Sequence, residues 1–128
     1  MTYSKNEIIK DKVTFGNTSL KPDSAICVAF GVDSIFIKAT VVSMLSFIEN
    51  NDGVFFDFNI ITSSIDNKDI NFINELTFDN YAITIHIINE HFFDGYQEKE
   101  NLPVSMYYRL LIPYILHIHT DRVLYVDA

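Results

Sequence analysis

Acidic residues close two of the apolar runs in this sequence. Asp33 follows the run at residues 25–30, after Gly31 and Val32, and Asp127 follows the run at residues 122–126. A carboxylate at such a position can accept hydrogen bonds from a polar ligand or bind a divalent cation that prefers oxygen ligands. The structural alternatives are a helix cap for Asp33 and an ordinary turn residue for Asp127.

The histidines and the single cysteine form only a weak metal-binding pattern. His117 and His119 lie two residues apart, whereas His86 and His91 are distant in sequence, and a zinc site needs three or four ligands. Cys27 stands inside an apolar run, which favours a small core residue and leaves no partner for an internal disulfide. The sequence contains none of the GxxxxGK[ST], GxGxxG or GxSxG motifs.

Apolar runs alternate with amphipathic segments in the order β-α-β-α-β-α-β. Residues 25–30 are apolar without alternation, as in a strand buried on both faces, and residues 35–49 repeat apolar side chains at helical spacing. The other predicted elements are strands at 54–61, 81–88 and 122–126, a helix from Ser63 or Ser64 to 78, and a helix from 103 to about 116 whose last turn Pro113 would kink. This order predicts an α/β fold with a mostly parallel sheet and helices on both faces. Ligands in such folds bind beyond the carboxyl ends of the strands, where Asp33 and Asp127 are predicted to lie.

Length and composition indicate one domain in a chain of 128 residues. Residues 1–24 are predicted to be an irregular lead-in and residues 25–128 the domain itself. The net charge of −8 argues against nucleic-acid binding and against docking of this segment on anionic lipid. The N-terminus lacks the apolar stretch of a signal peptide, no transmembrane span is predicted, and the single cysteine fits a reducing cytoplasm.

Three segments, taken in order, resemble a known enzyme family. They are Val28-Ala-Phe-Gly-Val-Asp33 with Phe36, then Ser105-Met-Tyr-Tyr-Arg-Leu-Leu-Ile-Pro113, then Asp121-Arg-Val-Leu-Tyr-Val-Asp-Ala128. They are similar to the AFGxD strand, the YxRL helix and the LYLDAD strand of the retaining glycosyltransferases of family 8. Within that family, the likeness is closest to bacterial enzymes that add glucose or galactose to the lipopolysaccharide core. The resemblance implies the Rossmann-like, nucleotide-sugar-binding half of a GT-A fold, incomplete at the C-terminus.

The resemblance also implies a metal site. Asp127 matches the first aspartate of a D-x-D motif and Ala128 its middle residue, at the nucleotide-sugar-binding edge; the second aspartate would come next, beyond the last residue. In this family the motif holds Mn²⁺ or Mg²⁺ against the donor diphosphate, where the cation acts as a Lewis acid.

The nucleotide-binding residues follow from the same resemblance. Asp33 would accept hydrogen bonds from the uracil or ribose, and Gly31 and Val32 would approach the base through their backbone. Phe36 matches an aromatic position that stacks on uracil, with a core position as its structural alternative. Arg109 matches an arginine that reaches the donor sugar and phosphate, for which its planar guanidinium is suited; a solvated surface position is its alternative. In the first strand's turn, Ile35 departs from the polar residue often found there, which puts that side-chain contact in doubt.

The implied reaction transfers glucose or galactose from UDP-glucose or UDP-galactose to a lipopolysaccharide core acceptor. The location expected is the cytoplasm, with peripheral association of the full-length protein at the cytoplasmic face of the inner membrane. The 128-residue chain alone is expected to be inactive and poorly stable, because one metal-binding aspartate and the acceptor half are missing from it. Two alternatives stay open. One is a non-catalytic, truncated remnant of the family. The other is a receiver-like α/β signalling domain, although the acidic pair and the phosphoacceptor aspartate of such domains are absent.

Overall fold

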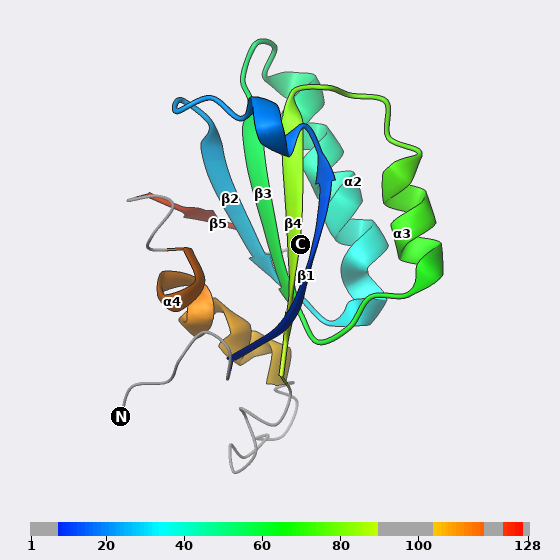
Figure 1. Ribbon diagram of the computed structural model, residues 1–128, viewed down its shortest axis with the longest axis vertical. Helices are drawn as coiled ribbons and strands as arrows, with labels where there is room; N and C mark the ends of the chain where they lie inside the picture. Colours follow the sequence, from blue (N-terminus) through cyan, green and yellow to red (C-terminus); the bar gives the residue numbers. More distant parts are fainter. Residues whose placement is uncertain (1–7, 90–103, 117–121, 127–128) are drawn as a thin grey trace.

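The computed structural model describes residues 8–89, 104–116 and 122–126, with the side chains of 104–107 excepted. Within them the chain forms one five-stranded sheet with helices on either side (Figure 1). The elements in chain order are β1 (Ile9–Gly16), η1 (Thr18–Leu20), β2 (Ile26–Gly31), η2 (Ser34–Phe36), α2 (Ile37–Asn50), β3 (Phe56–Thr62), α3 (Asn67–Asn74), β4 (Tyr81–Ile88), η4 (Val104–Leu111), α4 (Ile112–Leu116) and β5 (Leu124–Tyr125), where η denotes a 3₁₀ helix.

The sheet has the strand order β1-β4-β3-β2-β5. Strands β2, β3, β4 and β5 run parallel, and β1 alone pairs antiparallel, with β4. The predicted α/β class with a mostly parallel sheet is therefore confirmed.

The expectation of an irregular lead-in is wrong over residues 9–16, which form β1 at one edge of the sheet. Val13 and Phe15 of this strand pack on one core and Ile9 packs on the other, while Lys10, Asp11 and Lys12 are exposed. Because charged residues are a common feature of edge strands, the short apolar alternation was too weak to reveal the strand from sequence. The division into a lead-in and a domain at residues 24 and 25 stays a prediction.

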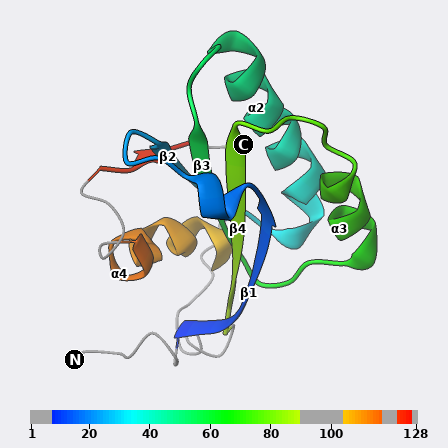
Figure 2. The same cartoon turned by 45° about the horizontal axis from the view of Figure 1, so that its top comes forward.

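Helices cover both faces of the sheet, as predicted (Figure 2). One face packs against α2 and α3, and its core includes Val28 and Phe30 of β2. The opposite face packs against η4 and α4, and there β2 contributes Cys27 and Ala29. Alternate residues of β2 thus enter two different cores, which explains the unbroken apolar run in the sequence.

The helices differ from the predictions at their ends. α2 begins at Ile37, because residues 34–36 form a 3₁₀ turn first. α3 is shorter than predicted and is capped neither by Ser63 nor by Ser64: the Asp66 carboxylate accepts a hydrogen bond from the Asp69 backbone N–H at 2.9 Å. An Asx side chain before the first turn satisfies an otherwise unpaired helical N–H.

The predicted helix at 103–116 is 3₁₀ up to Leu111 and becomes α-helical only at Ile112. Pro113 therefore lies in the first turn of α4 rather than in a kinked last turn. Proline is tolerated there because the N–H that it lacks would have no helical partner. β5 is also shorter than the predicted strand at 122–126. None of the described helices is long and apolar enough to cross a membrane.

Candidate functional site

Successive strands are added on one side of β2 and then on the other, so the strand order reverses beside β2. From β2 the chain places β3 and then β4 on one side, and after η4 and α4 it places β5 on the other side of β2. In an open α/β sheet, the crevice beyond the carboxyl ends of the strands at such a reversal is the usual ligand site. The structure therefore directs attention to the segment after β2 and to the end of β5.

The segment after β2 is fixed by backbone hydrogen bonds. The Val32 N–H donates to the Ile61 carbonyl at 3.0 Å, and the Phe36 N–H donates to the Asp33 carbonyl at 2.9 Å. Val32 is buried and Asp33 is half-buried. The Asp33 side chain makes no capping hydrogen bond to η2, so the structural alternative of a helix cap is wrong.

Phe36 is not a core residue. Its side chain is 51% exposed, next to Ile35 at 80%, although aromatic side chains are usually more buried than this. The turn that carries it is joined to α2, because the Thr40 hydroxyl donates to the Phe36 carbonyl at 2.9 Å. An exposed phenyl ring on an anchored turn offers a face on which a planar base can stack.

Arg109 meets the end of β2 through its backbone. A Cβ atom built at Gly31 would lie 3.0 Å from the Tyr108 Cβ and 3.4 Å from the Arg109 backbone nitrogen. Tyr108 is buried and Arg109 is exposed, so the arginine side chain leaves the core where the segment crosses β2. The structure thus brings the Arg109 backbone beside Gly31, while the donor-binding role of the arginine stays a prediction.

Asp127 and Ala128 lie outside the described residues. The chain is described as far as Val126, whose N–H donates to the Ala29 carbonyl at 3.0 Å, so β5 follows β2 toward its carboxyl end. Among the described ranges, no group of three His, Cys, Asp or Glu residues is placed to hold a metal ion. The expectation of Mn²⁺ or Mg²⁺ at Asp127 accordingly stays a prediction.

A small polar hollow of ≈ 160 Å³ adjoins the turn after β2. Ser34 and Ile35 line it from that turn, and Ser64, Asp66 and Asp69 line it from the segment after β3. Burial raises the pKa of Asp69, whereas the backbone N–H of Asp69 lowers the pKa of Asp66. Both carboxylates serve the start of α3, so the hollow has a structural explanation of its own.

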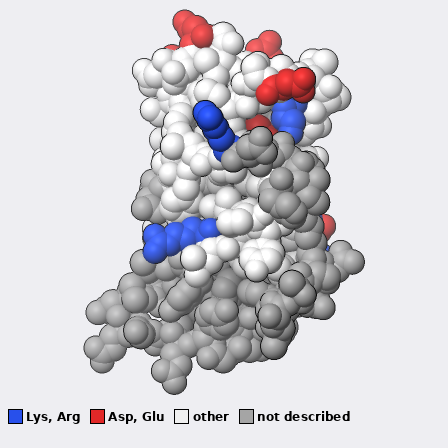
Figure 3. All heavy atoms as spheres, turned by 90° about the vertical axis from the view of Figure 1, so that its left-hand side faces the viewer, with Lys and Arg blue, Asp and Glu red and all other residues white. Residues whose placement is uncertain are grey.

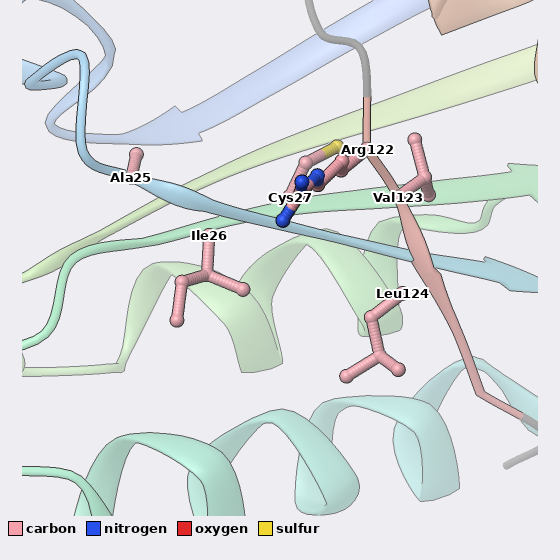
Figure 4. Close-up of a pocket in the computed structure, with 6 residues that line it drawn as sticks. All are labelled: Ala25, Ile26, Cys27, Arg122, Val123 and Leu124. Atoms are coloured by element: carbon pink, nitrogen blue, oxygen red, sulfur yellow. The ribbon is translucent and has the colours of Figure 1, made fainter.

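A larger pocket of ≈ 390 Å³ lies at the opposite, amino edge of the sheet (Figure 4). It is formed where β2 and β5 begin, and its lining includes Cys27 and Arg122. Burial raises the pKa of the Cys27 thiol to about 11, which keeps it protonated near neutral pH and unsuited to nucleophilic chemistry. The predicted core role of Cys27 is confirmed, and this pocket is distant in the fold from the strand reversal site.

A row of buried polar side chains crosses the sheet and was not predicted from the sequence. The Asn59 side chain joins His86 Nε2 at 2.9 Å and Cys27 Sγ at 3.4 Å, bridging β4, β3 and β2. This row explains His86 as a hydrogen-bonded core residue and not as a metal ligand. The one signal for it was the asparagine within an apolar strand. The other three histidines lie outside the described residues.

Comparison with known proteins decides the family. The family model for glycosyl transferase family 8 matches residues 27–128, which is most of the chain. The chain belongs to glycosyltransferase family 8. This membership agrees with the resemblance seen in the three sequence segments, and it decides against the receiver-domain alternative.

The chain is similar in sequence to two curated lipopolysaccharide glycosyltransferases, as their names state. The chain is 30% identical to the lipopolysaccharide 1,2-glucosyltransferase of Escherichia coli over 102 residues, covering 79% of this chain and 30% of that protein. It is 25% identical to the lipopolysaccharide 1,3-galactosyltransferase of Salmonella typhimurium over 128 residues, covering 98% of this chain and 38% of that protein. The chain therefore spans about a third of the length of each. No solved structure matches the chain significantly.

The sheet agrees with the Rossmann-like, nucleotide-sugar-binding half of a GT-A glycosyltransferase. The strand order also places the family's first-strand motif, which ends at Asp33, at the reversal point. On the side of the molecule that carries β5 and α4, the described residues show Lys and Arg side chains near the middle of the view and Asp and Glu side chains near its top (Figure 3).

Proposed function

We propose that this chain is the donor-binding part of a glycosyltransferase that moves glucose or galactose from a UDP-sugar to a lipopolysaccharide core acceptor. The observation that supports the proposal is the reversal of strand order beside β2 in a family 8 chain, with Asp33 and Phe36 in the segment after β2 and the Arg109 backbone against Gly31. The lipopolysaccharide acceptor is supported by the names of the two relatives.

The chemistry demands that the site hold a nucleoside diphosphate and stabilise its negative charge as it departs from the sugar. In the proposal, Asp33 accepts hydrogen bonds from the uracil or ribose and Phe36 stacks on the base. Arg109 donates to phosphate oxygens, for which its planar guanidinium is suited. Asp127 would supply a carboxylate ligand for Mn²⁺ or Mg²⁺, which neutralises diphosphate charge as a Lewis acid when bound.

Binding of UDP to residues 1–128 tests the assignment to this site. We expect Arg109→Ala to weaken binding measured by calorimetry with MnCl₂ present, because a charge-assisted hydrogen bond contributes about 1.5–3 kcal/mol. Arg122→Ala is the matched control, since Arg122 is an exposed arginine at the amino edge of the same sheet. Equal losses of affinity in both variants would contradict the proposed site.

Transfer itself is tested in a protein that carries this segment with the remaining family domain. We expect transfer from UDP-glucose or UDP-galactose to stop in excess EDTA and in the Asp127→Ala variant. Residues 1–128 alone are expected to show no transfer, because positioning of the acceptor supplies a large part of such rate accelerations. Turnover that is unchanged in EDTA would refute the metal assignment, and a longer protein that binds UDP without any transfer would favour the non-catalytic remnant.

A further inference from the structure

The residues of β2 that face η4 and α4 become smaller toward the proposed donor site. Cys27, Ala29 and Gly31 occupy alternate positions of this strand, and the first two belong to the core beneath η4 and α4. Tyr108 belongs to the same core. The side-chain volume between the strand and the overlying segment therefore falls to zero at Gly31, the last residue of β2.

The backbone conformation at position 31 does not require glycine. Among the described glycines, Gly16 and Gly53 have a positive φ angle, whereas Gly31 does not. What Gly31 provides is space, because an added Cβ would meet the Tyr108 Cβ at 3.0 Å and the Arg109 nitrogen at 3.4 Å. Neither atom can swing away by a rotamer change, since one is backbone and the other is attached to it. A side chain at position 31 therefore displaces η4 by a few tenths of an ångström.

A displacement of η4 would move two consecutive residues, of which Tyr108 is buried and Arg109 is exposed. Tyr108 is 3% exposed and anchors η4 in the core, whereas Arg109 is exposed and leaves that core at the end of β2. A bidentate hydrogen bond tolerates little misalignment. The packing of Tyr108 on Gly31 therefore determines which positions the Arg109 guanidinium can reach.

We propose that Gly31 is a positioning residue for donor binding, which acts through Tyr108 by seating η4 on the end of β2 and so directing Arg109. This inference rests on the proposed function, in which Arg109 holds the donor diphosphate. It differs from the role implied by family resemblance, where Gly31 approaches the base through its own backbone.

A double-mutant cycle in residues 1–128 tests the inference, with UDP and MnCl₂ as the probe. We expect Arg109→Ala to weaken UDP binding about tenfold or more. Gly31→Ala should weaken it about threefold to tenfold, because a small displacement degrades the arginine contact without removing it. The decisive variant is Gly31→Ala combined with Arg109→Ala, which should bind UDP as the Arg109→Ala variant does. The amide NMR signal of Arg109 should also move in unliganded Gly31→Ala, whose unfolding temperature shows that the variant folds.

The outcomes separate the two proposals. If Gly31→Ala lowers UDP affinity equally in the wild-type and the Arg109→Ala background, the positioning role of Gly31 is overturned. That result favours direct contact of Gly31 with the ligand or a general structural effect, and it leaves the proposed donor site intact. No loss from Gly31→Ala also overturns the positioning role. Normal UDP binding by Arg109→Ala overturns the role of Arg109 and this inference with it. Absence of UDP binding by the wild-type chain overturns the proposed function as well.

Discussion

Replacing Phe36 with alanine should separate ligand binding from folding. The side chain is 51% exposed, so folding buries only about half of it. A fully buried phenylalanine contributes about 1.5–3 kcal/mol, so we expect Phe36→Ala to cost roughly 1 kcal/mol of unfolding free energy. Loss of base stacking should cost a further 1–3 kcal/mol, approximately, in UDP binding, or about a 5- to 150-fold rise in Kd.

Phe78→Ala is a matched control for this experiment. Phe78 is 37% exposed and precedes β4 at the amino edge of the sheet, away from the proposed site. Thermal unfolding and calorimetric titration with UDP should show a comparable loss of stability in both variants, with a loss of affinity in Phe36→Ala alone. An unchanged Kd in Phe36→Ala, or the same loss in Phe78→Ala, would refute the stacking assignment.

Three other changes have defined outcomes. Asp33→Ala should weaken UDP binding, whereas Asp23→Ala, which removes an exposed aspartate before β2, should leave binding unchanged. Asp66→Ala should lower the unfolding temperature and Asp66→Ser should largely preserve it, since serine can cap α3. Because the folded-state pKa of Asp66 is lowered, its contribution is fully present above the unfolded-state pKa near 4 and is lost as the pH falls through the folded-state value. The difference in unfolding temperature between the wild-type chain and Asp66→Ala should therefore narrow in acid. The Cys27 thiol, with its pKa raised to about 11, should react slowly with iodoacetamide at pH 8 in the folded chain and much faster in urea; fast labelling of the folded chain would contradict its burial.

Most of the sheet could be predicted from sequence because strands buried on both faces leave a simple signal. The apolar runs that became β2, β3 and β4 were located almost to the residue, since both faces of each strand enter a core. β1 was missed because an edge strand needs few apolar residues, and its charged positions look like a loop. The antiparallel pairing of β1 with β4 also depends on contacts far apart in sequence, which no local pattern records.

The candidate site could be predicted from the sequence only in part. The family resemblance named Asp33 and Arg109 as donor-binding residues, which stays a prediction, and the structure brings the backbone of Arg109 to the end of β2. The seat of Tyr108 on Gly31 could not be foreseen, because it depends on how closely a 3₁₀ segment approaches the sheet. Helix ends were similarly decided by local hydrogen bonds, as Asp66 shows for α3.

Mapping of UDP onto the chain by amide NMR, with Mg²⁺ as a diamagnetic cation, can locate the donor site directly. We expect the signals of Gly31, Val32, Asp33, Phe36 and Arg109 to shift on titration, while signals around the larger pocket at Ile26 and Arg122 do not. Shifts confined to the amino edge of the sheet, or none at saturating UDP, would contradict a donor site at the carboxyl end of β2.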